Sequence, residues 1–243
     1  MDNIGISIAI LLIFFVISRA FNVFDFRGSI AALVVGFVVS VFGSYRWLIL
    51  LLIFATGSFI VTRAYFNRKS KINAQEGKKG ERGIYNVVYA GIIGLFVAFL
   101  NGTTFLANLG YFHYFTLFAV SLAVVNSDTF ASEIGVLDNK VRMITNFKRT
   151  VPGINGGVSL LGEMAALCGA LIIGISYGIL STHGFVISQV LIITAFGFLG
   201  CQIDSILGAV FENKGKLSKG MVNFLSAFII VIMMVPIIFF FGV

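Results

Sequence analysis

The sequence predicts an all-α membrane protein, a polytopic bundle of about eight transmembrane helices that forms a single domain over residues 1–243. Two observations predict this class. Hydrophobic residues make up 58% of the chain and charged residues only 11%, whereas a soluble globular domain carries about 25% charged residues. The apolar residues are also gathered into runs long enough to cross the hydrocarbon core of a bilayer as helices. A surface so poor in charge must face lipid.

Charged residues, glycine, asparagine and proline separate these apolar runs and mark where helices end. The first run has Asp2 before it and Arg19 after it, the reverse of the basic start of a secretory signal, so we expect it to be retained. The predicted spans cover residues 4–20, 28–43, 47–63, 85–101, 112–127, 156–180, 184–211 and 221–242.

Positive charge segregates to one side of the predicted bundle. With eight spans, 16 of the 17 Lys and Arg residues fall on one side, and Arg46 alone falls on the other. Because cytoplasmic connections are enriched in Lys and Arg, we expect both termini outside and the loops near 64–84, 128–155 and 212–220 in the cytoplasm. The net charge of +7 is carried beside membrane helices. It therefore favours anionic lipid heads or phosphate ligands over nucleic acid.

Three acidic residues, Asp128, Glu163 and Asp204, enter predicted spans at similar depths near the cytoplasmic side. A charged carboxylate at the bilayer centre costs about 2.5 to 3.5 kcal/mol, so each must face a cavity, a cation or a partner. Carboxylates without histidine or thiol ligands suit Mg²⁺, which takes one or two of them together with water and phosphate oxygens. We predict a Mg²⁺ site at these three acids; the alternative is a structural network in which each pairs with a loop Lys or Arg.

A glycine-rich segment from Pro152 to Gly157 leads into the sixth predicted span. Backbone N–H groups at the start of a helix bind phosphate, and glycines let the phosphate approach closely, although the same residues also mark a plain turn. Basic residues of the cytoplasmic loops supply the opposite charge. The predicted phosphate- and nucleotide-binding residues are Lys78, Arg82, Lys140, Arg142, Lys148, Asn155, Gly156, Gly157 and Ser205.

Three stretches taken together, Asn126–Gly135, Pro152–Gly162 and Gly200–Gly208, resemble the TMEM19/DUF92 integral membrane family. That family includes the plant phytyl-phosphate kinase of tocopherol synthesis. The resemblance implies transfer of a phosphoryl group from a nucleoside triphosphate, CTP being favoured, onto an isoprenoid monophosphate to give the diphosphate. In the matched motifs, the resemblance implies that four residues take part in this phosphoryl transfer: Asp128, Glu133, Asn155 and Asp204.

The chemistry of the residues agrees with this resemblance, because phosphoryl transfer needs a metal, cations and alignment more than covalent help. We predict a Mg²⁺-assisted prenyl-phosphate kinase of a prokaryotic cell membrane, with its site facing the cytoplasm. Asp128 and Asp204 hold the metal and Glu133 or Glu163 supports them. Glu133 follows Asp128 by five residues, about 140° around a helix, so the two share one ion only if the helix bends between them.

Two other functions use the same features. A CTP-dependent cytidylyltransferase that makes a CDP-lipid needs the same metal and the same cations but releases pyrophosphate. An ion-coupled transporter also carries intramembrane acids. It predicts acids near the midplane and inverted halves, however, whereas here the acids gather toward one face and no inverted pattern is visible.

Overall fold

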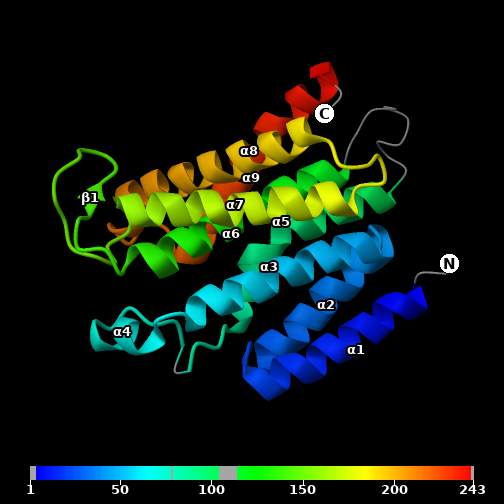
Figure 1. Ribbon diagram of the computed structural model, residues 1–243, viewed down its shortest axis with the longest axis horizontal. Helices are drawn as coiled ribbons and strands as arrows, with labels where there is room; N and C mark the ends of the chain where they lie inside the picture. The colour runs from blue at the N-terminus through cyan, green and yellow to red at the C-terminus, as the bar shows by residue number, and fades with distance from the viewer. Residues whose placement is uncertain (1–3, 78, 104–113, 242–243) are drawn as a thin grey trace.

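The structure is a computed structural model that describes residues 4–77, 79–103 and 114–241. It is a bundle of helices, so the predicted polytopic helical class is confirmed (Figure 1). Within these described residues, seven helices are long and apolar enough to cross a membrane, and α2 is a shorter apolar helix. These seven helices and α2 are α1 (Ile4–Phe21), α2 (Phe26–Phe42), α3 (Tyr45–Arg63), α5 (Ile84–Gly102), α6 (Tyr114–Gly135), α7 (Leu160–Leu180), α8 (Ile187–Leu207) and α9 (Lys219–Phe241).

Short elements join these helices at one end of the bundle. They are α4 (Phe66–Lys71), β1 (Arg142–Met143), β2 (Gly157–Val158) and a π-helical turn, η2 (Gly208–Glu212), that continues α8. In Figure 1, α1 begins and α9 ends at the end of the bundle opposite α4 and β1. The basic loops therefore share one end of the molecule. Which end faces the cytoplasm stays a prediction.

Two helix boundaries near the site differ from the predicted spans. The fifth predicted span stops at residue 127, but α6 continues to Gly135, so Asp128 and Glu133 both lie on the helix and the predicted loop 128–155 is shorter. The sixth predicted span starts at residue 156, but α7 begins at Leu160. Hydropathy alone misplaces both ends, because polar residues at the end of α6 remain helical when they face the interior of the bundle.

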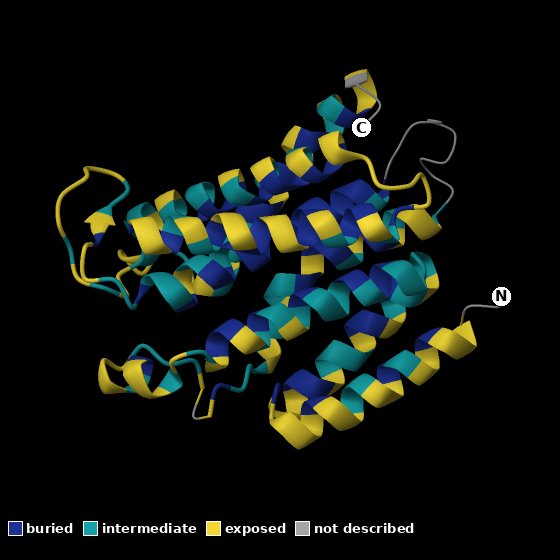
Figure 2. Cartoon of the chain, in the orientation of Figure 1, coloured by how far each residue is buried: buried dark blue, intermediate teal, exposed yellow. Residues whose placement is uncertain are grey.

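α6 is the central helix of the bundle. It packs against α3, α5, α7, α8 and α9. In its most apolar stretch of 18 residues, 78% of the residues are buried, against 17% in the corresponding stretch of α1. The outer helices instead expose large apolar side chains, such as Leu12 and Val16 of α1 (Figure 2). A surface of this kind is suited to lipid tails. Side chains at the end of α6 are therefore surrounded by protein on several sides.

Small residues let α7 and α8 approach α6 closely, as in other membrane helix pairs. A Cβ added to Gly200 on α8 would lie 2.4 Å from Val124, and one added to Gly169 on α7 would lie 2.8 Å from the Asn126 carbonyl oxygen. Gly200 is one turn before Asp204 on the same face of the helix. The close contact therefore turns Asp204 toward the interior of the bundle.

Candidate functional site

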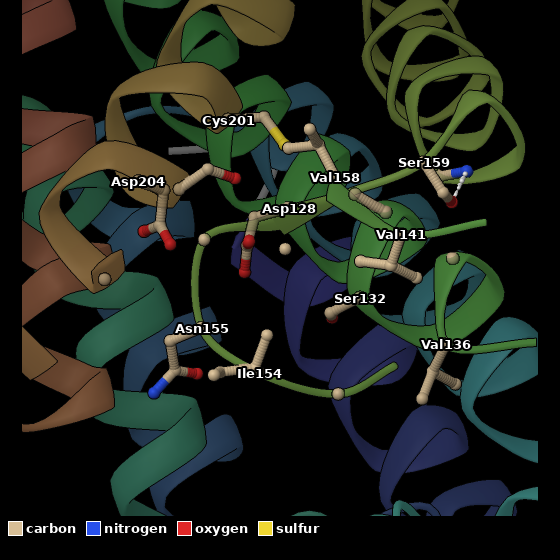
Figure 3. Close-up of a pocket in the computed structure, with 18 of the residues that line it drawn as sticks. Asp128, Ser132, Val136, Val141, Ile154, Asn155, Val158, Ser159, Cys201 and Asp204 are labelled. Carbon is tan, nitrogen blue, oxygen red and sulfur yellow. Dashed lines mark hydrogen bonds between the residues drawn. The ribbon is translucent and has the colours of Figure 1, made fainter. Parts of the chain in front are cut away.

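A cavity of about 210 Å³ opens where α6, α7 and α8 meet the loop between β1 and β2; we call it the anionic cavity. Asp128 from α6 and Asp204 from α8 point into the same space, and Asn155 of the loop faces them (Figure 3). The predicted site residues that line this cavity are Asp128, Glu133, Asn155, Gly156, Gly157, Glu163, Asp204 and Ser205.

The lining of this cavity carries a large excess of negative charge. Among the described residues, six of the ten acidic residues of the chain line it, with a single lysine, Lys219. The six acids are Glu76, Asp128, Glu133, Glu163, Asp204 and Glu212. A concave site lined by one sign of charge concentrates ions of the opposite sign. The cavity therefore attracts cations.

Asp128 is placed by its two preceding neighbours, which fasten α6 to α7. The Asn126 amide donates to the Gly169 carbonyl oxygen at 2.8 Å, and the Ser127 hydroxyl donates to the Ala166 carbonyl oxygen at 2.9 Å. Both side chains are fully buried. These bonds set the rotation and depth of α6, so that the next side chain, Asp128, points into the anionic cavity.

Asp204 is held by α9. Its Oδ2 accepts from the Ser226 hydroxyl at 2.9 Å and, with the amide nitrogen turned toward it, from Asn223 at 3.1 Å. The Lys219 ammonium acts electrostatically on both Asp128 and Asp204, and these two carboxyl groups interact with each other. Sequence reasoning missed these three α9 residues. Lys219, Asn223 and Ser226 are separated by four and then three residues, which places them on one face of a helix. This spacing is the pattern in the sequence that could have identified them.

Glu163 lies at the edge of this group, where its Oε2 accepts from the Gln202 amide at 2.8 Å. Within the described residues, no group of three or more His, Cys, Asp or Glu side chains is close enough to hold a metal ion. Asp128 and Asp204 are the two labelled carboxyl groups that point into the cavity in Figure 3, and they interact with each other. The role of Glu163 as a metal ligand stays a prediction.

Glu133 engages both of its oxygens within the protein. Its Oε2 accepts from the Lys69 ammonium at 2.6 Å, and its Oε1 accepts from the Thr62 hydroxyl at 3.0 Å. Lys69 is fully buried and also donates to the carbonyl oxygens of Val61 and Thr62. α6 is continuous through Glu133, and this carboxylate borders the anionic cavity while both of its oxygens bond groups of α3 and α4. Glu133 therefore holds the basic segment between α3 and α5 in place through Lys69. A direct catalytic role of Glu133 stays a prediction.

Arg82, between α4 and α5, lies beside Glu133. Its Nη2 donates to the Thr62 hydroxyl at 3.1 Å and is 4.0 Å from Glu133 Oε1. Burial lowers the pKa of the Arg82 guanidinium, while the nearby carboxylates of Glu133, Glu76 and Asp128 act in the opposite direction. Arg82 also lines a smaller cavity of about 40 Å³, which we call the middle cavity.

The other predicted cations lie apart from the carboxylates. Lys140, Arg142 and Lys148 are exposed on the hairpin formed by β1 and β2, and they do not line the anionic cavity. Arg142 donates to the Phe147 carbonyl oxygen at 3.0 Å, within the hairpin. Lys78 lies outside the described residues. The cations that the structure brings to the site are Lys219, Arg82 and Lys69.

The glycine-rich loop does not form the start of α7. The Ser159 hydroxyl caps that helix by accepting from the Gly162 N–H at 3.2 Å. The Gly157 N–H donates to the Ile154 carbonyl oxygen at 3.0 Å and is used within the turn. The loop instead covers the end of α8: Gly156, at φ +76°, packs against Ser205 and Ala209. Close approach of two backbones explains the glycine at this position.

We expect Gly156→Ala to destabilise the protein by about 2 kcal/mol or more, because its left-handed backbone disfavours a side chain. A Cβ there would also lie 2.4 Å from the Ala209 Cβ. Thermal unfolding in detergent measures the effect. Gly215→Ala is the control, because Gly215 has φ +66° but nothing within 4 Å of an added Cβ. Equal losses in the two variants would contradict the close contact.

Comparisons with known proteins agree with this architecture. A family model described as "Integral membrane protein DUF92" matches residues 8–232. An uncharacterized membrane protein of Methanocaldococcus jannaschii is 32% identical over 225 residues, which cover 92% of this chain and 90% of that protein. Protein PGR of Arabidopsis thaliana is 28% identical, with 80% of this chain and 74% of that protein covered. No solved structure matches the chain significantly. The chain belongs to the DUF92 integral membrane family.

Proposed function

We propose that this protein is a kinase that transfers a phosphoryl group from a nucleoside triphosphate, with CTP as the first candidate, to an isoprenoid monophosphate. The site faces the cytoplasm of a prokaryotic cell. One observation carries the proposal: Asp128 and Asp204 direct their carboxyl groups into one anionic cavity at the end of a bundle with an apolar outer surface. A soluble phosphate donor and a lipid acceptor can meet at such a place.

The excess of carboxylates in the cavity supports a metal-dependent reaction. A bare triphosphate would be repelled by six acidic side chains, whereas its complex with a divalent cation is attracted. Asp128 and Asp204 fit Mg²⁺, which is usually held by one or two carboxylates and completes its ligands with water and substrate phosphates. When bound, Mg²⁺ would neutralise charge that develops on the transferred phosphoryl group.

The size of the anionic cavity supports binding of phosphate groups within it and of the rest of the nucleotide at its opening. At about 210 Å³, it is smaller than the roughly 300 to 1,000 Å³ of most small-molecule sites. The hairpin of β1 and β2 contributes Val141, Gly157 and Val158 to the cavity lining and carries Arg142. Contacts from the predicted hairpin cations to the nucleotide belong to this proposal.

In the proposed reaction, a phosphate oxygen of the acceptor attacks the γ-phosphorus of the nucleotide. The bond from that phosphorus to the bridging oxygen breaks, and the nucleoside diphosphate leaves. The acceptor phosphate is already ionised, so no strong general base is needed. The protein positions the reactants and balances their charge. Ser226 and Asn223 orient Asp204, and the positive charge of Lys219 acts on both carboxylates.

An assay with purified protein in detergent tests the proposal. Phytyl, geranylgeranyl and longer prenyl monophosphates are each offered with Mg²⁺ and CTP or ATP labelled at the γ- or the α-phosphate, and the lipid products are separated by chromatography. We expect γ-label in a prenyl diphosphate, with release of the nucleoside diphosphate. Incorporation of α-label would establish the cytidylyltransferase instead. Absence of label from every lipid would contradict both enzymes and favour the ion-coupled transporter.

A further inference from the structure

An apolar cavity of about 50 Å³ lies among α1, α2, α3 and α5. On α3 its lining extends from Leu51 to Phe59, which spans about 12 Å along the helix axis. Most of the lining is aliphatic or aromatic, and its polar side chains are Ser58, Arg82 and Asn86. The apolar cavity thus extends into the thickness of the bundle and ends at a charged group.

The three cavities follow one another along the interior of the protein. Arg82, Asn86 and Ala90 line both the apolar cavity and the middle cavity. Five residues, Glu76, Asp128, Ser132, Glu133 and Lys219, line both the middle cavity and the anionic cavity. The series runs from an apolar surface, past a guanidinium group, to the carboxylates of the candidate site. A ligand with an anionic head and an apolar chain matches this order of chemistry.

Arg82 at the first junction retains capacity for an anionic partner. Its side chain is 16% exposed, and its Nε is buried with no hydrogen-bond partner among the described residues. A buried donor left without a partner costs about 1 to 3 kcal/mol. Glu133 Oε1 lies 4.0 Å from Arg82 Nη2, but the shorter ion pair of Glu133 is with Lys69, at 2.6 Å. A phosphate group at Arg82 would satisfy both the free donor and the remaining positive charge.

We propose that the apolar cavity and Arg82 form the binding site for a single-chain lipid monophosphate, the acceptor of the reaction proposed above, on which this inference rests. The chain lies among α1, α2, α3 and α5, and the phosphate lies in the middle cavity. The narrow cavity favours one hydrocarbon chain over the two chains of a phospholipid. The acceptor phosphate then reaches Asp128 through the middle cavity, which shares this residue with the anionic cavity.

Binding of radiolabelled geranylgeranyl monophosphate to the full chain in detergent, with Mg²⁺ and without nucleotide, tests the site. Ala55→Phe fills the apolar cavity and Arg82→Gln removes the charge, and we expect each to weaken binding at least tenfold. Ala9→Phe is the matched control, because Ala9 is exposed on α1 and lines no part of the cavity; we expect unchanged binding. Arg82→Gln should leave binding of geranylgeraniol, the free alcohol, within twofold.

The inference is overturned if Ala55→Phe and Arg82→Gln both bind the lipid phosphate as the wild type does. It is also overturned if dioleoyl phosphatidate competes as well as the prenyl phosphate. Arg82→Lys, which keeps the charge, replaces Arg82→Gln if thermal unfolding shows the latter to be misfolded, and it should retain part of the affinity. If the lipid phosphate binds as expected but no nucleotide transfers a phosphoryl group to it, the site is supported and the proposed kinase is rejected. If transfer occurs and Ala55→Phe and Arg82→Gln both leave the KM for the lipid unchanged, the site alone is rejected.

Discussion

Asp204→Asn is expected to lower kcat on the order of a thousandfold, the scale on which charges that stabilise phosphoryl transfer act. The asparagine keeps the shape of the side chain and still accepts a hydrogen bond from Ser226, but it loses the negative charge that faces Asp128. The fold should survive, because one charge is removed from a group of mutually repelling acids. Initial rates with Mg²⁺, CTP and a prenyl monophosphate measure the effect, and thermal unfolding checks the fold.

Asp138→Asn is the control for this experiment. Asp138 lies after the end of α6, outside the anionic cavity, and its Oδ1 accepts from the Lys140 N–H. The variant removes the same charge from the same end of the protein. We expect its kcat to stay within twofold of the wild type, because Asp138 does not line the cavity. An Asp204→Asn variant as active as Asp138→Asn would remove Asp204 from the site.

Lys69→Met is expected to destabilise the protein by about 3 to 5 kcal/mol, because the buried Glu133 carboxylate loses its 2.6 Å ion pair and keeps only the Thr62 hydroxyl and the more distant Arg82. The ammonium group of Lys69 is fully buried and bonded to Glu133 and to two carbonyl oxygens of α3. The double variant Lys69→Met/Glu133→Gln should recover most of this loss, since the uncompensated charge is gone. Equilibrium unfolding in mixed micelles measures both variants.

Lys71→Met provides the comparison for the buried lysine. Lys71 ends the same short helix but is exposed, so we expect a change within about 0.5 kcal/mol. Similar losses for Lys69→Met and Lys71→Met would contradict a specific role for the buried ion pair. A double variant no more stable than Lys69→Met would show that the loss arises from packing and not from the charge of Glu133.

The fold was largely predictable because a bilayer leaves few solutions for an apolar chain. A membrane-spanning helix needs roughly 20 apolar residues, and the eight predicted spans correspond to the seven long helices and the shorter α2 of the described residues. The errors fall at the site itself, where α6 continues past residue 127 and α7 starts at Leu160. At those positions polar side chains face protein and not water, and hydropathy does not distinguish the two environments.

The acids of the candidate site were also predictable, because a carboxylate inside a membrane span requires a special environment. Asp128 and Asp204 were identified in this way, and the structure brings them to one cavity. The basic partners were not predictable. Six cations lie in the segment between α3 and α5, and no local pattern shows that Lys69 is the buried one. The choice depends on Glu133, which lies 64 residues away in sequence.

Binding of Mn²⁺, which accepts the same oxygen ligands as Mg²⁺, tests the central claim most directly. Electron paramagnetic resonance counts the ions bound to the purified protein with a non-hydrolysable CTP analogue. The account predicts that the wild type binds Mn²⁺ in the presence of the nucleotide, and that Asp128→Asn and Asp204→Asn each weaken this binding at least tenfold. Equal Mn²⁺ affinity in the wild type and in both variants would contradict it.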